Sequence, residues 1–298
     1  MDDQARAANP VTRRRPDASS TLSLLLGLPA FLCSLAVVAA VGTYALPRAP
    51  WLIPVLWVLS GAVLFVPSVE PVVTRLLLKA RRPSQAELDD LWQPWQAVCR
   101  VAGVAPDRFV LMVEDSDDLN AFAAGGRTVA VTRTALRLPP KHLDAVLAHE
   151  LGHHLSGHPM VDVLSRWYAL PARGAAFLAM LALRVILAVA SAFARVGGSV
   201  SVVVALLLSL LVLTMLAFLS VWLLLVPLIS PFLAWARRLG ELSADRVAAS
   251  LGYGPHLADV LHRWFSVSGQ RPEGLRKGLL ATHPSPATRI QRLHGLMR

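Results

Sequence analysis

His149-Glu150-Leu151-Gly152-His153 is the segment from which the architecture of this chain can be worked out. On a helix, residues four apart lie on one face, so both imidazoles can reach one metal ion while Glu150 lies beside its open side. This arrangement is typical of metal-assisted hydrolysis, in which zinc activates a water molecule and the glutamate accepts a proton from it.

The residues around this motif predict the helix that its chemistry requires. Pro139 and Pro140 fit a helix start, and apolar residues recur at positions 143, 146, 147 and 151. Gly157 is suited to end the helix. We therefore expect a helix over about residues 140–157.

Long uncharged runs indicate a membrane protein. Hydrophobic residues make up 55% of the chain and charged residues only 16%. Residues 21–46 and 51–69 carry no charge, and each run is long enough to cross a bilayer core of about 30 Å. Residues 198–231 are also uncharged, and residues 175–194 are apolar apart from Arg184. We expect four membrane-embedded helices.

Positive charge is distributed unevenly around the first two apolar runs. The turn between them has Arg48 alone, whereas eight basic residues flank their outer ends: Arg6, Arg13, Arg14, Arg15, Arg75, Lys79, Arg81 and Arg82. Because basic loops stay in the cytoplasm, the motif is expected on the cytoplasmic side. The net charge of +10 lies largely beside the apolar runs, and no groove-reading motif is present. It favours anionic lipid as a partner over nucleic acid.

The expected fold is α+β and mostly α: a multi-span helical membrane protein with a zincin-like cytoplasmic protease domain that carries a small β-sheet. Residues 109–113 and 128–132 are rich in β-branched side chains and predict strands, with a loop over 116–126 between them. Ser84 and Glu87 have capping-box spacing at the start of a helix that Pro94 should bend or split.

Five segments are expected along the chain. They are a disordered cytoplasmic tail (1–20), a transmembrane hairpin (21–70), the first part of the protease domain (71–174), two further membrane-embedded helices (175–231) and the second part of the protease domain (232–298). The active site must therefore combine residues from both sides of the second membrane segment.

Two histidines leave the metal site incomplete, because a catalytic zinc ion usually keeps three protein ligands. The metzincin pattern would need glycine at position 156 and histidine at 159, where Ser156 and Pro159 stand. His158 follows the expected helix end and lies on a different helical face, which disfavours it. Carboxylates remain. Glu241 and Asp245 are four residues apart, so one could bind zinc while the other accepts the outer N–H of a ligand histidine.

Taken in order, these motifs resemble those of the HtpX-like and CAAX-prenyl-protease-like membrane metalloproteases. The resemblance covers residues 100–298 through Asn120-Ala121-Phe122-Ala123, His149 to His153, Glu241 to Asp245, and His283-Pro284 with Arg289-Ile290. It implies one zinc ion per chain, bound by His149, His153 and Glu241, with Glu150 as general base. Asp245 would support a ligand histidine.

The resemblance also implies how a substrate is held. Asn120 and Ala121 would belong to an edge strand that binds an extended peptide through main-chain hydrogen bonds. His283 would stand near the developing oxyanion, and Arg289 would contribute to substrate binding. On the residues alone, His283 could equally be a capping or surface histidine, and Arg289 could pair with an acidic residue of the fold. The remaining histidines are expected to be ordinary polar residues: His142, His154, His256, His262 and His294.

The expected function is that of a membrane-bound zinc metalloendopeptidase in the quality control of membrane proteins, a multi-pass protein of a bacterial cell membrane. Its partners would be polypeptide substrates and the lipid bilayer, and its oligomeric state stays open. Three alternative functions fit parts of the sequence. A signalling metalloprotease of the antirepressor-sensor type would add a sensor domain, which neither the Arg48 turn nor the end at Arg298 provides. A non-catalytic scaffold does not need Glu150, and a transporter is suggested only by Arg184.

Overall fold

The computed structural model describes residues 18–67, 69, 70, 72, 75, 80–268 and 284–297. The chain forms two compact units, and each is described by itself. The sheet unit comprises Met1–Leu25, Ser60–Ser165 and Ala234–Arg298, and the helical unit comprises Leu26–Leu59 and Arg166–Leu233.

A four-stranded mixed sheet forms the centre of the sheet unit. Its strands are β1 (Ala80–Arg81), β2 (Val110–Glu114), β3 (Ala121–Ala124) and β4 (Thr128–Thr132), in the spatial order β1-β2-β4-β3. β2 and β4 are parallel, whereas β1 and β3 are antiparallel to their neighbours. β3 therefore lies at an edge of the sheet.

The strands β2 and β4 confirm the sequence pattern, but the loop expected over residues 116–126 was wrong for β3. Ala121-Phe122-Ala123-Ala124 has low intrinsic strand propensity because alanine is depleted in strands. Its strand conformation comes from pairing with β4, in which Ala121 lies opposite Val131 and Ala124 opposite Thr128. The family resemblance had placed an edge strand here, whereas local propensity had not.

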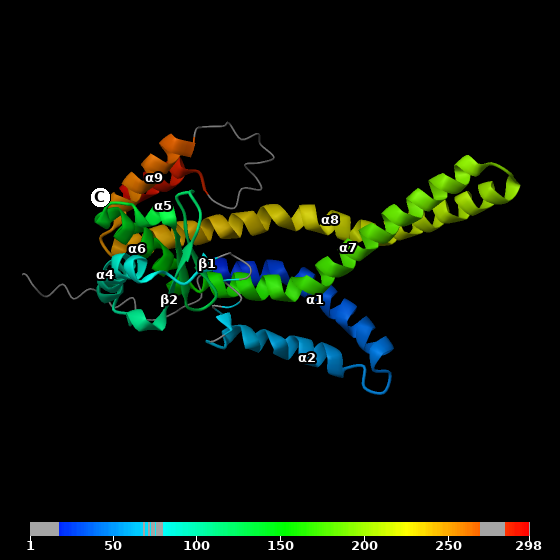
Figure 1. Ribbon diagram of the computed structural model, residues 1–298, viewed down its shortest axis with the longest axis horizontal. Coiled ribbons are helices and arrows are strands. Elements are labelled where there is room, and N and C mark those ends of the chain that lie inside the picture. Colours follow the sequence, from blue (N-terminus) through cyan, green and yellow to red (C-terminus); the bar gives the residue numbers. More distant parts are fainter. Residues whose placement is uncertain are drawn as a thin grey trace, which may run out of the picture. The chain divides into compact units, whose positions relative to one another are not determined.

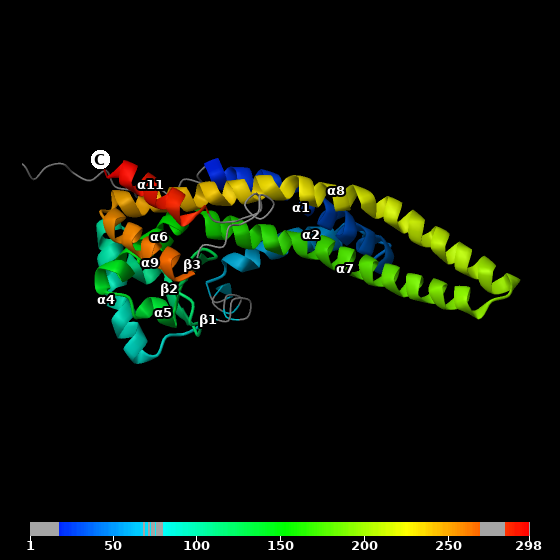
Figure 2. The ribbon, with the colours of Figure 1, turned by 90° about the horizontal axis from the view of Figure 1, so that it is seen from above.

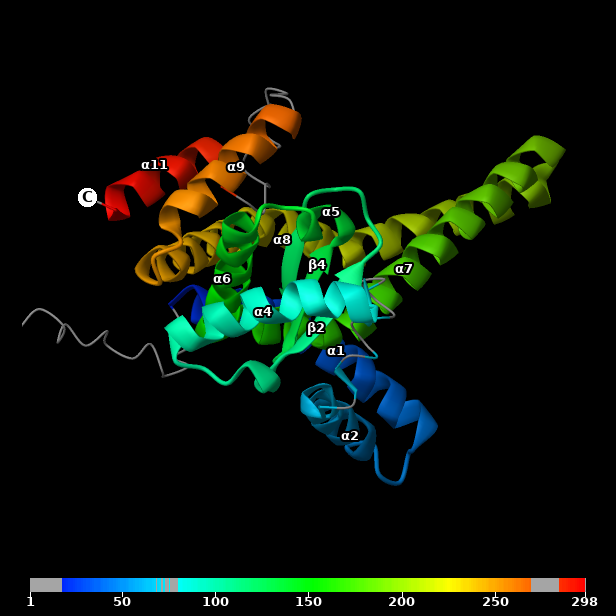
Figure 3. The same ribbon diagram turned by 60° about the vertical axis from the view of Figure 1, so that its left-hand side comes forward.

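The helices of the sheet unit that follow β1 in the chain pack against the sheet or against one another. They are α4 (Gln85–Ala102), α5 (Arg133–Leu136), α6 (Pro140–Ser156), α9 (Gly254–Ser268) and α11 (Pro286–Leu296), with short 3-10 turns η1 (Gly61–Phe65) and η2 (Pro106–Arg108). Figure 3 shows α4 crossing in front of β2 and β4, with α6 beside it. In Figure 2, α9 and α11 lie next to each other, as their mutual packing requires.

α4 begins as the sequence predicted but does not break at its proline. The Ser84 hydroxyl accepts from the Glu87 amide, and the Glu87 carboxylate accepts from the Ser84 amide, which completes the capping box. The helix runs through Pro94 as one element because Leu91 and Trp95, on either side of the proline, are fully buried in the core. Packing thus outweighs the lost backbone hydrogen bond.

The main core lies between the sheet and these helices. Leu147 and Leu151 of α6 pack with Trp95 of α4, with Val129 of β4 and with Leu293 of α11, and all five side chains are buried. A smaller cluster of Ala80, Met112 and Ala130 lies on the opposite face of the sheet. Alternate residues of β2 and β4 thus serve two different cores, as the period of a strand requires.

The helical unit contains parts of four long or apolar helices. They are α1 (Ala18–Ala45), α2 (Leu52–Ser60), α7 (His158–Val196) and α8 (Ser199–Ser250). α7 and α8 form an antiparallel pair, visible in Figure 1. They are joined at Gly197 and Gly198, whose φ angles of 77° and 89° lie in the region that favours glycine. Beyond these glycines, most of the apolar run 198–231 and of the helical pattern at 237–251 belongs to the one continuous helix α8.

Aromatic packing and two hydrogen bonds join α1, α2 and α7 within the helical unit. Phe31, Trp57 and Tyr168 have ring centroids between 5.2 and 5.6 Å apart. The Tyr168 hydroxyl donates to the Val58 carbonyl at 2.6 Å, and the buried Ser34 hydroxyl accepts from the Ala172 amide. Hydrogen bonds of this kind hold helices together where the surroundings are apolar.

Two helices among the described residues are long and apolar enough to cross a membrane, α1 and α7. Leu52–Phe65 and Ser199–Thr214 are apolar but shorter within the part of the chain that was searched. Large apolar side chains of these helices are exposed, among them Leu25, Phe177 and Leu206. Two of the four expected spans thus meet the test of length and composition.

Candidate metal centre

The motif residues lie on α6, which spans Pro140–Ser156 as predicted and ends at Gly157, with φ 77°. Glu241 and Asp245 lie on α8. Ligand atoms of His149, His153 and Glu241 lie within 4.8 Å of one another. Nε2 of His149 is 3.5 Å from Oε2 of Glu241, and Nε2 of His153 is 3.5 Å from Oε1. Two helices whose ligand residues are about 90 positions apart in sequence thus bring three side chains to one point.

These distances fit a zinc ion. In a tetrahedral site with bonds of about 2.1 Å, neighbouring ligand atoms are about 3.4 Å apart. The 3.5 Å separations agree with that value, and two imidazoles with one carboxylate are a donor set that catalytic zinc uses. The cluster is therefore a candidate zinc site.

Close contact between α6 and α8 depends on Gly152, the fourth residue of the motif. A Cβ atom at this position would lie 2.9 Å from both the Cα and the carbonyl oxygen of Ala244. Because both atoms belong to backbone, they could not move aside without shifting a helix. Glycine at 152 and alanine at 244 therefore let the two ligand-bearing helices approach each other.

Asp245 contacts the ligand candidate His149, and Arg289 contacts Asp245 in turn. Oδ1 of Asp245 is 2.9 Å from Nδ1 of His149, on the ring edge away from Glu241. The Arg289 guanidinium donates to both oxygens of Asp245, at 2.6 and 2.7 Å, and its Nη1 lies 3.3 Å from Glu241. Arg289 is 5% exposed and Asp245 is 2% exposed. Such partners fix the orientation of a ligand histidine.

The charges of this network shift each other's protonation. Burial raises the pKa of Asp245, but hydrogen bonds from His149 and Arg289 outweigh burial and hold it below its usual value. Burial and Arg289 lower the pKa of His149, yet its hydrogen bonds with Asp245 and Glu241 outweigh them and raise it. The carboxylates of Asp245 and Glu241 thus favour positive charge at His149.

Glu150 belongs to the same motif, and β3 packs against the helix that carries it. Glu150 is buried, with 5% exposure. Its negative charge helps to raise the pKa of Arg289. α6 packs against β3, whose neighbour in the sheet is β4. Asn120 precedes β3 and exchanges hydrogen bonds with Thr132 of β4, and Ala121 is the first residue of the strand. The structure therefore places an edge strand along the helix that carries the candidate ligands.

Comparison with known proteins agrees with this arrangement. The sequence profile of peptidase family M48 matches residues 85–297. The chain belongs to peptidase family M48. Membership confirms the resemblance expected from the motifs and indicates a metalloprotease, whose metal is typically zinc. No curated protein matched the chain.

The fold is similar to that in the crystal structure of S. mikatae Ste24p. The two chains share 18% sequence identity with a TM-score of 0.50, and the match covers 92% of this chain and 64% of that chain. This M48 peptidase therefore spans less than two thirds of the length of Ste24p. At this identity the likeness concerns the fold alone.

Glu70 is a residue that sequence reasoning missed. It lies between η1 and β1, is buried, and its Oε1 accepts from the Arg127 amide, the Thr128 amide and the Thr128 hydroxyl at 2.7 to 3.0 Å. A Cβ atom at Gly125, whose φ is 56°, would lie 2.7 Å from the Glu70 carboxylate. Glu70 thus holds the β3–β4 turn. Its signal in the sequence was a lone carboxylate directly after the apolar run 51–69.

Two neighbouring histidines have structural contacts instead of a place among the candidate ligands. His154 is buried, and its Nε2 lies 2.9 Å from the Thr128 carbonyl of β4. His158 begins α7, and its Nε2 lies 2.7 Å from the Ser19 hydroxyl. Its ring centroid is 6.0 Å from that of His153. His283, expected near the oxyanion, lies outside the described residues.

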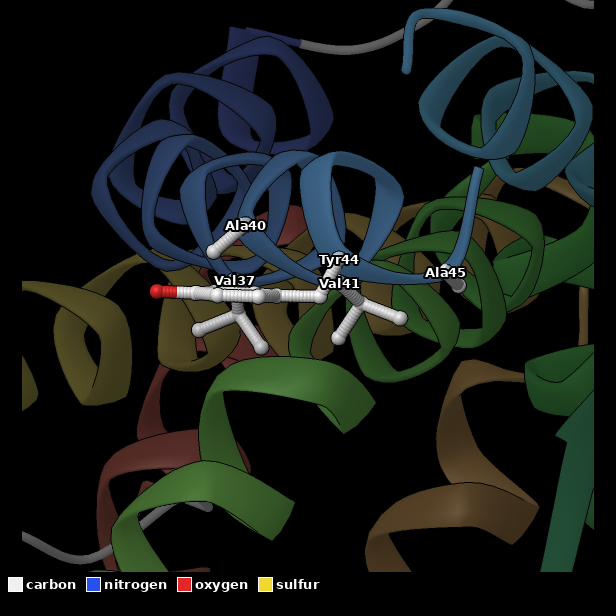
Figure 4. A pocket seen from close by; sticks show the side chains of 5 residues that line it. All are labelled: Val37, Ala40, Val41, Tyr44 and Ala45. Atoms are coloured by element: carbon white, nitrogen blue, oxygen red, sulfur yellow. The ribbon is translucent and has the colours of Figure 1, made fainter. Parts of the chain in front are cut away.

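An open apolar pocket on α1 belongs to the helical unit. Its lining is Val37, Ala40, Val41, Tyr44 and Ala45 (Figure 4). None of these side chains carries a carboxylate, imidazole or thiol, so the pocket offers no group for the chemistry of a peptidase. The cluster of His149, His153 and Glu241 remains the candidate site.

Proposed function

We propose that this M48 peptidase is a zinc metalloendopeptidase embedded in the bacterial cell membrane, which cleaves membrane-associated or misfolded membrane proteins on the cytoplasmic side. The observation that carries the proposal is the convergence of His149, His153 and Glu241 within 4.8 Å beside Glu150. Zinc bound there would polarise the scissile carbonyl and acidify a water molecule.

Glu150 would act as general base. Its carboxylate follows the ligand His149 directly and is enclosed by protein, so it can accept a proton from a water molecule at the site and later deliver it to the leaving amine. No covalent bond to the substrate is needed, because water is the attacking group and the carboxylate only accepts and returns a proton.

Asp245 and Arg289 would position His149. The Nδ1–H of His149 donates to Asp245, which leaves Nε2 free to face the metal, and Arg289 holds the carboxylate in place through two hydrogen bonds. The burial of Arg289 and its bidentate pairing favour this positioning role over the substrate binding expected from the resemblance. Arg289 thus acts through Asp245 on the ligand.

Substrate binding would use the backbone of β3. An extended peptide can add to an edge strand through main-chain hydrogen bonds, which tolerate many side-chain sequences. Asn120 and Ala121 lie at the start of this strand, and Glu70 fixes the turn at its other end. His283 would assist near the oxyanion. The broad tolerance of strand addition suits an enzyme that removes damaged proteins.

A comparison of membranes tests this function. Membranes that contain the wild-type chain should accumulate new peptide termini on cytoplasmic segments of membrane proteins, whereas membranes that contain Glu150→Gln at the same level should not. Mass spectrometry of termini makes the comparison. Identical sets of termini in the two preparations would refute proteolysis by this site, and new termini confined to the outer face would refute its cytoplasmic orientation.

A further inference from the structure

A second group of metal-binding side chains lies outside the candidate catalytic site. His142 is in the first turn of α6, and His256 and Asp259 are in α9. One ligand atom of each lies within 4.8 Å of the others. The three residues belong to the sheet unit, and α6 and α9 pack directly against each other.

His142 is unsatisfied in a way that points to a missing partner. Neither of its ring nitrogens has a hydrogen-bond partner among the described residues, although both atoms are buried. A buried polar atom without a partner destabilises the folded state, and native proteins contain few of them. Oδ2 of Asp259 is 3.8 Å from Nε2 of His142 and thus too far for a hydrogen bond.

That separation suits a shared cation instead. Two ligand atoms of one zinc ion lie about 3.4 Å apart, so Nε2 of His142 and Oδ2 of Asp259 need to move by only a few tenths of an ångström. His256 and Asp259 are three residues apart on α9 and share one face of that helix. The ring of His256 has its centroid 5.7 Å from that of His142. The two helices thus present three donors to one point.

The donor set favours zinc, which binds imidazole nitrogen and carboxylate oxygen readily. Imidazole binds a metal ion in its neutral form, so zinc and protons compete for His142 and His256. The Asp259 side chain is 66% exposed, so an ion there can exchange with solvent and keep water as a fourth ligand.

We propose that His142, His256 and Asp259 bind a second zinc ion, which fastens the start of α6 to α9. His142 precedes His149 by seven residues, or about 10 Å along the helix, so the ion would anchor the element that presents the catalytic motif. The site is independent of the proposed catalytic zinc, and its role is to stabilise the fold.

Zinc stoichiometry of the full chain in detergent micelles tests the proposal, measured after equilibration at micromolar free zinc. The wild type should hold two ions, and Asp259→Asn and His256→Ala should each hold one. The matched control is His262→Ala, which removes an exposed histidine from the same helix and should leave two ions. In a His153→Ala background the second site should still hold one ion, so failure of the catalytic site is distinguished from failure of this one.

Thermal unfolding gives a second readout that does not depend on activity. In the His153→Ala background, zinc should raise the unfolding temperature, and Asp259→Asn should abolish that rise while leaving the temperature in chelator unchanged. Equal zinc content in Asp259→Asn, His256→Ala and wild type would overturn the proposal. So would occupancy of the second site only at millimolar zinc, which would mark adventitious binding.

Discussion

Asp245 serves two partners at once, and this dual use explains its burial. It accepts from His149 and from Arg289, so the carboxylate, the imidazole and the guanidinium form one connected group with only 2–7% exposure. A buried charge is tolerated only when it is paired, and each charge here has a partner. The group holds the Nε2 atom of His149 toward Glu241.

Asp245→Asn should weaken zinc binding about 10- to 100-fold, because the amide accepts less strongly from His149 and no longer balances Arg289. Competition with a chromophoric chelator measures the affinity. Asp162→Asn is the control, since Asp162 forms a partly exposed pair with Arg237 at 3.7 Å and should leave zinc binding unchanged. Equal affinity in Asp245→Asn and wild type would remove Asp245 from the metal site.

Gly152→Ala should destabilise the chain by about 1–3 kcal/mol, since the added methyl group meets the backbone of Ala244 at 2.9 Å. Alanine favours helix more than glycine does, so the observed loss is what remains after that gain. Gly174→Ala is the matched control, because nothing lies within 4 Å of a Cβ atom there. Chemical unfolding in micelles compares the two, and a Gly152→Ala variant as stable as Gly174→Ala would show that the helices can separate freely.

At the scale of elements, the edge strand is held by a residue outside the sheet. Glu70 accepts three hydrogen bonds from the β3–β4 turn, and β3 has few large side chains of its own. The position of β3 beside α6 therefore depends on this carboxylate more than on strand propensity.

Glu70→Ala should speed hydrogen exchange at the Thr128 amide and raise the KM for peptide substrates more than it lowers kcat, because the strand loses its support while Glu150 is untouched. Glu114→Gln, a change at the end of β2, serves as the control. A Glu70→Ala variant with slow exchange at Thr128 and an unchanged KM would show that β3 keeps its position without this residue.

The capping box of α4 should make the stability of the folded state depend on pH. Hydrogen bonds from Arg81, then from the Ser84 amide, lower the pKa of Glu87 to about 2. The folded state therefore binds fewer protons than the unfolded state, and the stabilisation is present above about pH 4.5 and is lost as the pH falls toward 2. Glu87→Gln should flatten the loss of stability in this window, measured by circular dichroism. If the stability of Glu87→Gln fell with pH as steeply as that of the wild type, this role of Glu87 would be contradicted.

For the whole molecule, the motifs predicted more than local propensity did. The prolines and apolar spacing around His149 to His153 predicted α6, and Gly157 predicted its end. The spacing of Glu241 and Asp245 singled out the carboxylates that lie beside the histidines. The contribution of Glu70 could not be predicted, because its partners are 57 and 58 residues away and no local pattern encodes such a contact. The same holds for His142, which looked like an ordinary polar residue.

The orientation of the whole chain in the membrane can be tested by cysteine labelling. Arg48→Cys should react with an impermeant maleimide added outside intact cells, and Asp118→Cys should react only after permeabilisation, because we place the site on the cytoplasmic side. Both positions are exposed. Native Cys99 should not interfere, since burial raises the pKa of its thiol to about 12. The reverse labelling pattern would place the site on the outer face.

The most direct test of the central claim is the rate of peptide-bond hydrolysis by purified Glu150→Gln, measured with bound zinc determined in the same samples. The account predicts unchanged zinc at His149, His153 and Glu241 and a rate reduced by about 10²- to 10⁴-fold, the usual contribution of a general base. Hydrolysis at the wild-type rate by zinc-loaded Glu150→Gln would contradict it.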